Sequence, residues 1–532
     1  MTDVETIEIG HQACTGTGMT VAGEKRASDI VTPAIWTGFA MMCVGMFMAI
    51  LDVQVVATSL PTIQQALNIP QDQMSWIQTA YLIAEIIAIP LTGFLMRTLT
   101  MRWMFTIAVL LFTLASIACA ASGSFLSLIT FRIFQGFFGG TLIPAVFSAV
   151  FLLFPMQLQP LAATVAGVLA VLAPTIGPIV GGWITETYSW PWLFLINVLP
   201  GLLAASVAWM SLPKDSISFR QIRNLDVTSL GLGATALAGL EVAIKEAPNR
   251  GWTSSLTVSL LCLFAVTALG FVFRTLRAPE PLVNLRTFRD RNFTIGCLLS
   301  FLLGMGLFGS VYLMPVFLAY VRAHNSFEIG QIMLITGVAQ LIAAPVAVLL
   351  VRRIDERFLT AIGFLLFAIG LGLSSVQTMA TDFGEMFWPQ LVRGCAIMFC
   401  ILPPTQLALG HLGKSAVEDA SGLFNLMRNL GGAIGIALID TVIYTRSPEY
   451  GRAFIERLTA GDLDTAKNLG IKAEDLTAAA LDPEKQAALS SIVGKAAFVD
   501  AINDAWRLIA VITIVALIAI PFARRTETPS PG

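Results

Sequence analysis

The sequence has 532 residues, of which 56% are hydrophobic and only 12% are charged, and its mean hydropathy is +0.78. Soluble proteins carry about 25% charged residues, so this composition excludes a soluble globular chain. Apolar runs recur along the whole length and are too long for the strands of a membrane barrel, so we expect an all-α integral membrane protein. The net charge of −2 carries no information on partners, because it averages loops that lie on opposite sides of a membrane.

Residue types that serve metal binding or covalent chemistry form no motif. The seven cysteines lie mostly inside apolar runs without a CxxC spacing, and there are only three histidines, so we predict neither a disulfide framework nor a metal site. The nucleophile elbow, phosphate loop and dinucleotide fingerprint do not occur in their proper contexts, which argues against an enzyme and against an ATP-driven pump. We expect no cofactor and no nucleic-acid partner.

Apolar stretches bounded by charges or by Pro and Gly clusters predict fourteen spanning helices. The first six lie near residues 34–59, 75–96, 102–121, 125–151, 160–184 and 191–211. The remaining eight lie near residues 226–246, 254–274, 292–318, 328–350, 357–377, 385–409, 416–444 and 502–522. Residues 1–33 lack the pattern of a cleavable signal peptide, and they are expected to form a cytoplasmic tail, as are residues 523–532.

The distribution of lysine and arginine predicts that both termini are cytoplasmic. With this orientation the cytoplasmic segments hold most of the basic residues: Lys25, Arg26, Arg97, Arg102, Lys214, Arg220, Arg223, Arg274, Arg277, Arg286, Arg289, Arg291, Arg352, Arg353, Arg357, Lys414, Arg524 and Arg525. The short outer loops hold only Lys245, Arg250 and Arg322. The long outer segment 446–501 translocates regardless of its charge, and its composition predicts a small, partly helical lobe with breaks at Gly461, Gly470 and Pro483.

The sequence carries a weak internal repeat at an offset of eight helices. Gln135-Gly136 in span four is followed by Pro144, and Arg393-Gly394 in span twelve is followed by Pro403. Glycine clusters also occur in both the fifth and the thirteenth spans. We interpret this as two parallel six-helix halves, residues 34–211 and 292–522, with an inserted pair at 226–274, which implies rocking around a central site. Chance similarity among apolar helices is the alternative interpretation.

Six short motifs occur in order on these helices. They are Leu51-Asp52 with Leu60-Pro61, Ile89-Pro90-Leu91-Thr92-Gly93, Arg132-x-x-Gln135-Gly136, Gly177-Pro178-x-x-Gly181-Gly182, Arg291-Asn292-Phe293-Thr294-Ile295-Gly296 and Arg428-x-x-Gly431-Gly432. With them the sequence resembles the major facilitator superfamily, and within it the fourteen-helix drug:proton antiporter branch of the EmrB/QacA type. The resemblance covers nearly the whole chain.

That resemblance implies the superfamily fold and the export of lipophilic drugs or toxic compounds across a bacterial inner membrane, driven by the proton gradient through alternating access. By the same resemblance we expect membrane lipid around the helices. A periplasmic membrane-fusion adaptor of the EmrA type and an outer-membrane channel of the TolC type are implied as partners, with segment 446–501 as a contact surface.

The loop after span two departs from the pattern of the superfamily. The superfamily usually places an acid a few residues after Gly93, but residues 93–102, which include Arg97 and Arg102, contain none. A charge-paired latch is therefore not expected in this loop. The corresponding loop of the second half keeps Arg352, Arg353, Asp355 and Arg357, so we expect a latch to operate from that side.

Charged residues inside the spans are the candidates for proton coupling, because each costs at least about 2.5 kcal/mol at the membrane centre. Asp52 and Arg132 fall at the same depth and are expected to pair while Asp52 is ionised and to separate when it is protonated. Glu85 lies roughly 15 Å into span two, where apolar surroundings favour the neutral acid. We predict Asp52 and Glu85 as proton carriers that Arg132 modulates; a static buried ion pair is the alternative. Asp440 is expected to be a solvated residue near a helix end.

The remaining candidates belong to a central cavity and to a bent helix. By their place on helices that the resemblance puts around the cavity, we expect the following lining residues: Gln54, Tyr81, Phe134, Gln135, Phe138, Phe308, Tyr312, Arg393, Asn425 and Arg428. The two arginines would hold an anionic substrate group or bond to helix carbonyls. Pro174, Gly177, Pro178, Gly181 and Gly182 match the antiporter motif and predict a kink at the interface of the halves, with small-residue packing as the alternative.

Two other functions remain open at this stage. A proton-coupled carrier of one physiological metabolite would need the same buried charges and the same fold. A receptor or structural membrane protein would not need Asp52 and Glu85 inside the membrane. Inhibition of transport by many unrelated lipophilic compounds would favour the drug exporter, and inhibition by one polar competitor would favour the metabolite carrier.

Overall fold

The computed structural model describes residues 32–69, 76–215, 226–278, 281, 283–351, 353–471 and 483–524. Within this part of the chain the regular structure is entirely helical. The helices of the first half are α2 (Pro33–Leu67), α3 (Trp76–Ala88), α4 (Leu91–Ala120), α5 (Phe125–Leu153), α6 (Gln159–Thr187), α7 (Trp192–Leu195) and α8 (Val198–Ser211). The others are α10 (Val227–Arg250), α11 (Ser255–Arg277), η1 (Leu285–Arg289), α12 (Arg291–Tyr320), α13 (Ser326–Val351), α14 (Glu356–Leu373), α15 (Phe383–Leu409), α16 (Lys414–Thr459), α17 (Leu463–Asn468), α19 (Pro483–Ala519) and η2 (Ile520–Phe522).

The helices of the described residues are of membrane-spanning length. Twelve are long and apolar enough to cross a bilayer, thirteen when the bent helix α6 is counted, and α3 is a shorter apolar helix. The predicted fourteen spans are compatible with this set.

The predicted loop after span two falls on a break inside α4. Helix α3 ends at Ala88, since Pro90 lacks the N–H that would continue it, and the chain resumes a helical path at Leu91. At Thr100 the backbone leaves the helix with a φ of 74°. Before this break α3 runs parallel to α5, and after it α4 runs alongside α2. The chain therefore turns back at Thr100, within residues 97–102.

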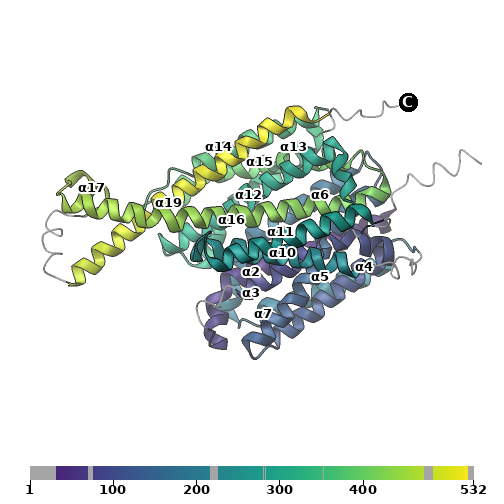
Figure 1. Cartoon of the computed structure of the whole chain (residues 1–532), viewed down its shortest axis with the longest axis horizontal. Coiled ribbons are helices and arrows are strands. Elements are labelled where there is room, and N and C mark those ends of the chain that lie inside the picture. The colour runs from purple at the N-terminus through teal and green to yellow at the C-terminus, as the bar shows by residue number, and fades with distance from the viewer. Residues whose placement is uncertain are drawn as a thin grey trace, which may run out of the picture.

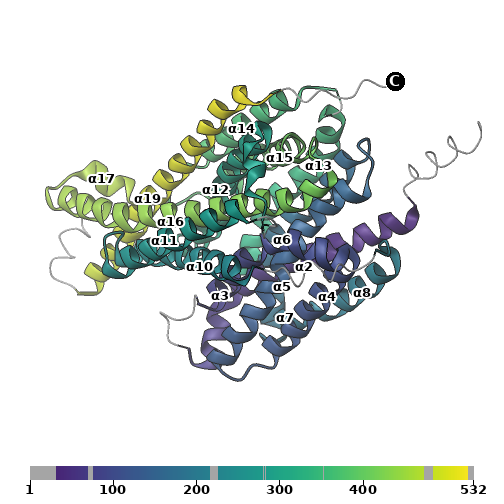
Figure 2. The same cartoon turned by 45° about the vertical axis from the view of Figure 1, so that its right-hand side comes forward.

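The helices form two groups that meet along the middle of the molecule (Figures 1 and 2). Helices α2 to α8 pack mainly on one another, and so do α12 to α16 with α19. Between the groups α6 packs on α13, while α16 packs on α4 and α5. The pair α10 and α11 lies beside both groups, where α10 contacts α3 on one side and α16 on the other. The residue bounds of the halves stay predictions.

Two long helices carry the segment predicted as an outer lobe. Helix α16 has 46 residues and α19 has 37, so both continue well past the roughly 20 residues that a bilayer requires. With α17 they form the projection at the left of Figure 1. The chain breaks where the sequence predicts, since Gly461 and Gly470 have φ of 79° and 70° and α19 begins at Pro483.

The ends of the two groups opposite this projection are joined by one apolar cluster. It unites buried residues of the first half, such as Phe105 and Phe154, with residues of the second half, such as Met398, Leu409 and Phe424. At this end the apolar cluster is continuous across the two halves.

Candidate transport cavity and buried charge network

A cavity of about 380 Å³ lies between the two groups of helices. Helices α2, α3, α5 and α6 form one wall, α12, α15 and α16 form the other, and α10 closes one side. Its lining residues on α10, which include Glu241 and Lys245, lie in the C-terminal part of that helix. The apolar cluster borders the cavity, since Ile143 and Phe147 belong to both.

The cavity wall is mainly apolar, with a few charged and polar side chains. The aromatic and aliphatic lining includes Phe147, Phe308 and Ile401. The polar side chains of the lining are Gln54, Gln78, Thr79, Glu85, Glu241, Lys245, Tyr312, Arg428, Asn429 and Asp440. A concave apolar wall with a small number of polar groups is typical of a site for a lipophilic small molecule.

The residues predicted to line the cavity divide into two sets. Gln54, Phe308, Tyr312 and Arg428 line it. The other six, which are Tyr81, Phe134, Gln135, Phe138, Arg393 and Asn425, are not among the lining residues. Phe134 is 53% exposed on the outside of α5, whereas the polar members of this set are buried inside their own half. The rotation of each helix about its own axis decides whether a residue lines the cavity, and sequence periodicity predicts this rotation poorly.

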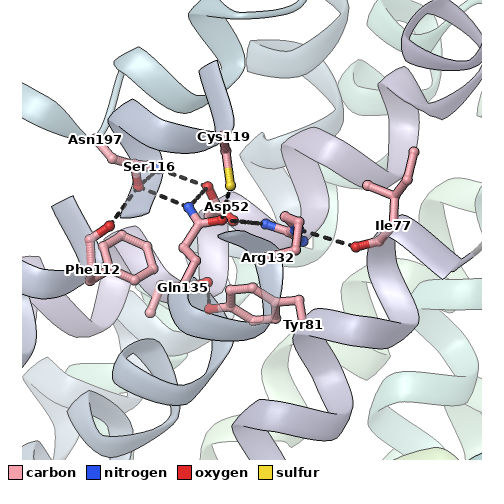
Figure 3. Close-up of polar contacts among 10 residues, drawn as sticks. Asp52, Ile77, Tyr81, Phe112, Ser116, Cys119, Arg132, Gln135 and Asn197 are labelled. Atoms are coloured by element: carbon pink, nitrogen blue, oxygen red, sulfur yellow. Dashed lines mark hydrogen bonds and ion pairs between the residues drawn. The ribbon is translucent and has the colours of Figure 1, made fainter. Parts of the chain in front are cut away.

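Asp52 is not among the residues that line the cavity, and it lies in a network of polar side chains inside the first half (Figure 3). Its side chain is completely buried, and its Oδ2 is 2.5 Å from Nη1 of Arg132, which is also completely buried. Its Oδ1 accepts hydrogen bonds from Gln135 at 2.9 Å and from Asn197 at 2.7 Å. The pair expected from equal depth is thus present, and every oxygen of the carboxylate has a partner, as a buried charge requires.

Arg132 connects this carboxylate to three other helices. Its Nε donates to the carbonyl oxygen of Ile77 at 3.1 Å, and its guanidinium lies over the ring of Tyr81 at 4.3 Å. Gln135 accepts from the same guanidinium at 2.9 Å and donates to the hydroxyl of Ser116. Among the described atoms Nη2 of Arg132 has no hydrogen-bond partner, so one donor remains free to follow a change of charge nearby.

Two glycines allow α3 and α5 to approach closely enough for this network. A Cβ at Gly136 would lie 2.2 Å from the carbonyl oxygen of Tyr81, and one at Gly140 would lie 2.5 Å from that of Glu85. The backbones therefore touch where α5 carries Arg132 and Gln135. The spacing Gly136-x-x-x-Gly140 therefore forms a packing seam between α5 and α3.

Glu85 faces the cavity one helical turn after Tyr81. It is buried within the protein, and it lies within electrostatic range of both Arg132 and Glu241. The two predicted proton carriers therefore occupy different positions. Glu85 is in contact with the cavity, Asp52 is not among its lining residues, and the charge of Arg132 acts on both.

The second half holds buried arginines without a carboxylate partner in the described structure. Arg393 is 3% exposed, lies over the ring of Trp506 at 5.2 Å, and its Nη1 has no hydrogen-bond partner. Arg428 donates to the side chain of Asn425 and lies 5.3 Å from the ring of Phe147 in the other half. Of the two, only Arg428 is placed to meet a substrate.

Asp440 is not the solvated helix-end residue that the sequence predicts. Helix α16 continues to Thr459, so Asp440 lies inside it, lines the cavity and accepts a hydrogen bond from Tyr312 at 2.7 Å. A similar correction applies to Lys245. It was expected in a short outer loop, but α10 extends to Arg250 and Lys245 lines the cavity.

Residues 93–102 of the first half, which are predicted to be cytoplasmic, form an ion pair with the other half that the sequence did not lead us to expect. Arg97 forms an ion pair with Asp419 of α16, and Asp419 also accepts from the backbone N–H of Asn284 at 3.3 Å. The missing acid is thus supplied by the other half. Arg102 lies over the ring of Trp209 at 3.9 Å, and Gly93 is buried.

In the matching loop of the second half, Asp355 and Arg357 pair with each other at 2.8 Å. Arg357 also donates to the carbonyl oxygen of Ala523, so these two residues bond within their own half. Arg352 lies outside the described residues. The latch across the halves that the described residues show therefore involves Arg97, and the expectation that the second-half loop alone would carry one is wrong.

The predicted antiporter motif lies on a bend. Its two segments, Gln159–Pro174 and Ile179–Thr187, meet at 46°, as the prolines and glycines predict. Pro174 lines the cavity, and a Cβ at Gly177 would meet the side chain of Gln54 at 2.4 Å. Gly181 and Gly182 are buried, and the side chain of Pro178 lies outside the described structure.

Sequence reasoning missed four polar side chains of this region. Ser116 and Asn197 complete the Asp52 network, while Glu241 and Lys245 line the cavity from α10. The available signal was the same in each case, a polar residue inside an apolar run. The partner of each lies on another helix, and neither periodicity nor spacing indicates which one.

A helical membrane protein with two groups of helices around one cavity, and with buried charges at that cavity, has the architecture of a membrane transporter. The sequence profile of the Major Facilitator Superfamily matches residues 42–436, and this chain belongs to that family. It is a multi-pass membrane protein with the superfamily fold.

Curated relatives lie in the predicted EmrB-like branch. The Colistin resistance protein EmrB of Acinetobacter baumannii is 40% identical over 408 residues, which cover 76% of this chain and 80% of that protein. The Multidrug export protein EmrB of Escherichia coli is 31% identical over 398 residues, covering 74% and 78%. The Fatty acid resistance protein FarB of Neisseria gonorrhoeae is 29% identical over 415 residues, covering 78% and 82%. The resemblance found from the motifs is confirmed.

Solved structures agree on the fold. The proton:xylose symporter XylE aligns with a TM-score of 0.58 at 13% identity, covering 94% of this chain and 98% of the other. The human organic anion transporter MFSD10 aligns with a TM-score of 0.57 at 14% identity, covering 92% and 100%. At such identities the alignments speak for the fold alone.

Proposed function

We propose that this protein is a proton-coupled antiporter that exports lipophilic toxic compounds across the inner membrane by alternating access. The observation that carries the proposal is the cavity, which is mainly apolar and places Glu85 on its wall within electrostatic range of the buried Asp52–Arg132 pair. The names of the relatives, which describe multidrug export and resistance to colistin and fatty acids, support export of harmful amphiphiles.

The apolar wall favours cargo that is itself apolar over most of its surface. Transfer of such surface out of water contributes about 25 cal/mol per Å². Few fixed hydrogen bonds then have to be matched, which suits a site that accepts varied compounds. A carrier of one polar metabolite would instead need several convergent hydrogen-bond groups, and the polar side chains of this cavity are spread over five helices.

Proton coupling uses the charge of Arg132. While Glu85 and Asp52 are ionised, both attract the guanidinium, and Asp52 also bonds to it directly. Protonation of Glu85 from the cavity removes one of these attractions and leaves Arg132 with Asp52. Protonation of Asp52 then releases Arg132, whose free Nη2 is available for a new partner. The network spans α2, α3, α4 and α5, so its rearrangement acts on the packing of the whole half.

The closed end of the cavity agrees with a state of the exporter in which substrate cannot enter from that end. The apolar cluster and the Arg97–Asp419 pair hold the halves together at one end. By the orientation that lysine and arginine predict, this end and both termini face the cytoplasm. The projection formed by α16, α17 and α19 then lies on the periplasmic side. There we propose contact with a membrane-fusion adaptor that leads to an outer-membrane channel.

The test is transport by the full-length protein in proteoliposomes with an imposed pH gradient. Ethidium serves as a fluorescent lipophilic cation and oleate as a lipophilic anion. We expect proton-driven accumulation of at least one of them, dissipation of the pH gradient when it is added, and inhibition by unrelated lipophilic compounds. Glu85→Gln and Asp52→Asn should each weaken the coupling to protons. Glu246→Gln is the matched control, because Glu246 pairs with Arg250 outside the cavity wall.

Three outcomes would contradict the proposal. Transport that ignores the pH gradient would remove proton coupling. Unchanged coupled transport by both Asp52→Asn and Glu85→Gln would remove these residues from it. Inhibition by a single polar compound, with no effect of lipophilic ones, would favour the metabolite carrier.

A further inference from the structure

The inserted helix α10 brings a second carboxyl group into the cavity. Glu241 lines the same cavity as Glu85 of α3, and the two carboxyl groups lie within electrostatic range of each other. Oε2 of Glu241 is buried and has no hydrogen-bond partner within the described structure. A buried carboxyl oxygen without a donor is costly when ionised, so this residue has no evident structural task.

The nearest cation does not neutralise Glu241 by a direct contact. Lys245 follows one turn later on α10 and also lines the cavity, but no ion pair joins the two among the described residues. Its Nζ is buried without a hydrogen-bond partner and lies over the ring of Trp76 on α3 at 4.3 Å. A cation–π contact of this kind leaves the amine charge available to act through space.

The position of α10 makes this group part of the moving machinery. Lys245 touches α3 of the first half through Trp76, and Trp252, directly after α10, donates to the hydroxyl of Thr441 on α16 at 3.0 Å. Helix α10 therefore contacts both halves beside the cavity. Any rocking of the halves changes the distance between Glu241 and the charges on α3 and α16.

We propose that Glu241 is a second proton-exchanging carboxyl of the transport cavity, which acts as a coupled pair with Glu85. The inference rests on the proposed antiport. It assigns to the inserted helix α10 a role in proton exchange, and not only the role of a spacer between the halves.

The chemistry of the pair follows from two like groups in one cavity. Two carboxylates close together in a medium of low dielectric resist simultaneous ionisation, so the pair loses its protons in two separate steps. In each step an O–H bond breaks and one proton passes to water in the cavity, leaving one negative charge. The other charges that face the pair are Arg132 of α5, Lys245 of α10, Arg428 and Asp440 of α16, and the phenol of Tyr312 on α12. An exporter that lacks Glu241 therefore exchanges one proton fewer per turnover than the wild type.

The first experiment measures protonation without any substrate. Infrared difference spectra of the full-length protein in liposomes report the carbonyl stretch of protonated carboxyl groups as the pH is raised. We expect Glu241→Gln and Glu85→Gln each to remove part of the band that the wild type loses, and to leave one of the two titration steps that belong to the pair. Glu246→Gln, on the same helix but outside the lining, should leave the band unchanged. Glu241→Asp keeps a carboxyl at the position and should restore the two steps.

The second experiment measures the coupling ratio. In proteoliposomes without an electrical potential, a fixed ethidium or oleate gradient is balanced against the pH gradient that stops net flux. Loss of one exchanged proton should raise the pH difference needed for balance in Glu241→Gln, with Glu246→Gln at the wild-type value.

The proposal is overturned if Glu241→Gln keeps the full band and the wild-type balance point, even when its transport rate falls, since a structural role changes the rate alone. If the wild type moves neither compound, the proposed export of these amphiphiles fails, while the infrared titration still decides whether Glu241 and Glu85 exchange protons as a pair.

Discussion

Asp52 of α2 and Arg132 of α5 form an ion pair in which both side chains are completely excluded from solvent. Three further donors and acceptors fix this pair, from Gln135, Asn197 and the carbonyl of Ile77. The desolvation of two charges makes such a pair a poor source of net stability, but its disruption leaves one charge buried alone.

Replacement of Asp52 by alanine should therefore destabilise the protein more than the double replacement. We expect Asp52→Ala to cost about 3 kcal/mol or more, because the guanidinium of Arg132 stays buried without a carboxylate. The double variant Asp52→Ala/Arg132→Met should recover most of this loss, although it should not transport. Thermal unfolding in detergent, followed by the loss of monodisperse protein, measures both effects. Equal losses in the single and double variants would show that the charge on Arg132 is already compensated elsewhere.

The α3–α5 seam offers a test that introduces no charge. In Gly136→Ala the new methyl group would meet the carbonyl oxygen of Tyr81 at 2.2 Å, so the backbones must separate. Overpacking of this kind costs about 1–3 kcal/mol. It should also displace the Tyr81 ring from the guanidinium of Arg132 and lower transport. Gly372→Ala is the control, since nothing lies within 4 Å of its Cβ position. Equal unfolding temperatures for the two variants would contradict the close approach.

The features of this protein that can be predicted from sequence are those determined within single helices. Apolar runs indicate where each helix lies, and equal depth in neighbouring spans indicates that Asp52 meets Arg132. The unpredictable part consists of contacts between elements far apart in sequence. Asp419 lies 322 residues after Arg97, and the local sequence around each residue does not indicate that the two form a pair. The rotation of α5 placed Phe134 on the outside, and only the packing of α10 against α3 and α16 shows that Glu241 and Lys245 enter the cavity.

The ion pair between Asp382 and Arg322 in the second half should make the stability of the protein depend on pH. Asp382 caps the N-terminus of α15 and accepts a hydrogen bond from Arg322 at 2.7 Å. The bond from Arg322, followed by the backbone N–H of Phe383 and the ring of His324, holds the pKa of Asp382 below its usual range.

A carboxyl whose pKa is lower in the folded state stabilises the fold above its unfolded-state pKa, and this contribution is lost as the pH falls through the folded-state pKa. The wild type should thus lose stability on acidification below about pH 4, and Asp382→Asn should lose less over the same range. Both residues of the pair are about one third exposed, with 32% and 34% of their side-chain surface accessible, so solvent screening keeps the effect small. Thermal unfolding at a series of pH values, compared with Asp464→Asn as an exposed control on α17, measures it. Parallel curves for wild type and Asp382→Asn would contradict the assignment.

The contact of Arg97 with Asp419 should govern how readily the closed end of the cavity opens. Arg97 lies on the first half just before the turn at Thr100, and Asp419 lies at the start of α16 in the second half. The carboxylate is 7% exposed and is also held by the N–H of Asn284, so this pair is worth more than a pair on the open surface. A charge-assisted bond with these features contributes about 1–2 kcal/mol.

Because about 1.4 kcal/mol changes an equilibrium tenfold, Arg97→Ala or Asp419→Ala should raise the population of the open end by roughly that factor. Hydrogen exchange in residues 91–99 and 414–424 should then accelerate, while exchange in α14 stays the same. The swap Arg97→Asp/Asp419→Arg restores opposite charges, and we expect it to slow exchange again relative to either single variant. Because a single equilibrium links the two ends of an alternating-access transporter, the same single variants should bind substrate more readily from the closed side and release it more slowly on the other. If both single variants and the swap exchange hydrogen at the wild-type rate, the apolar cluster alone holds this end closed.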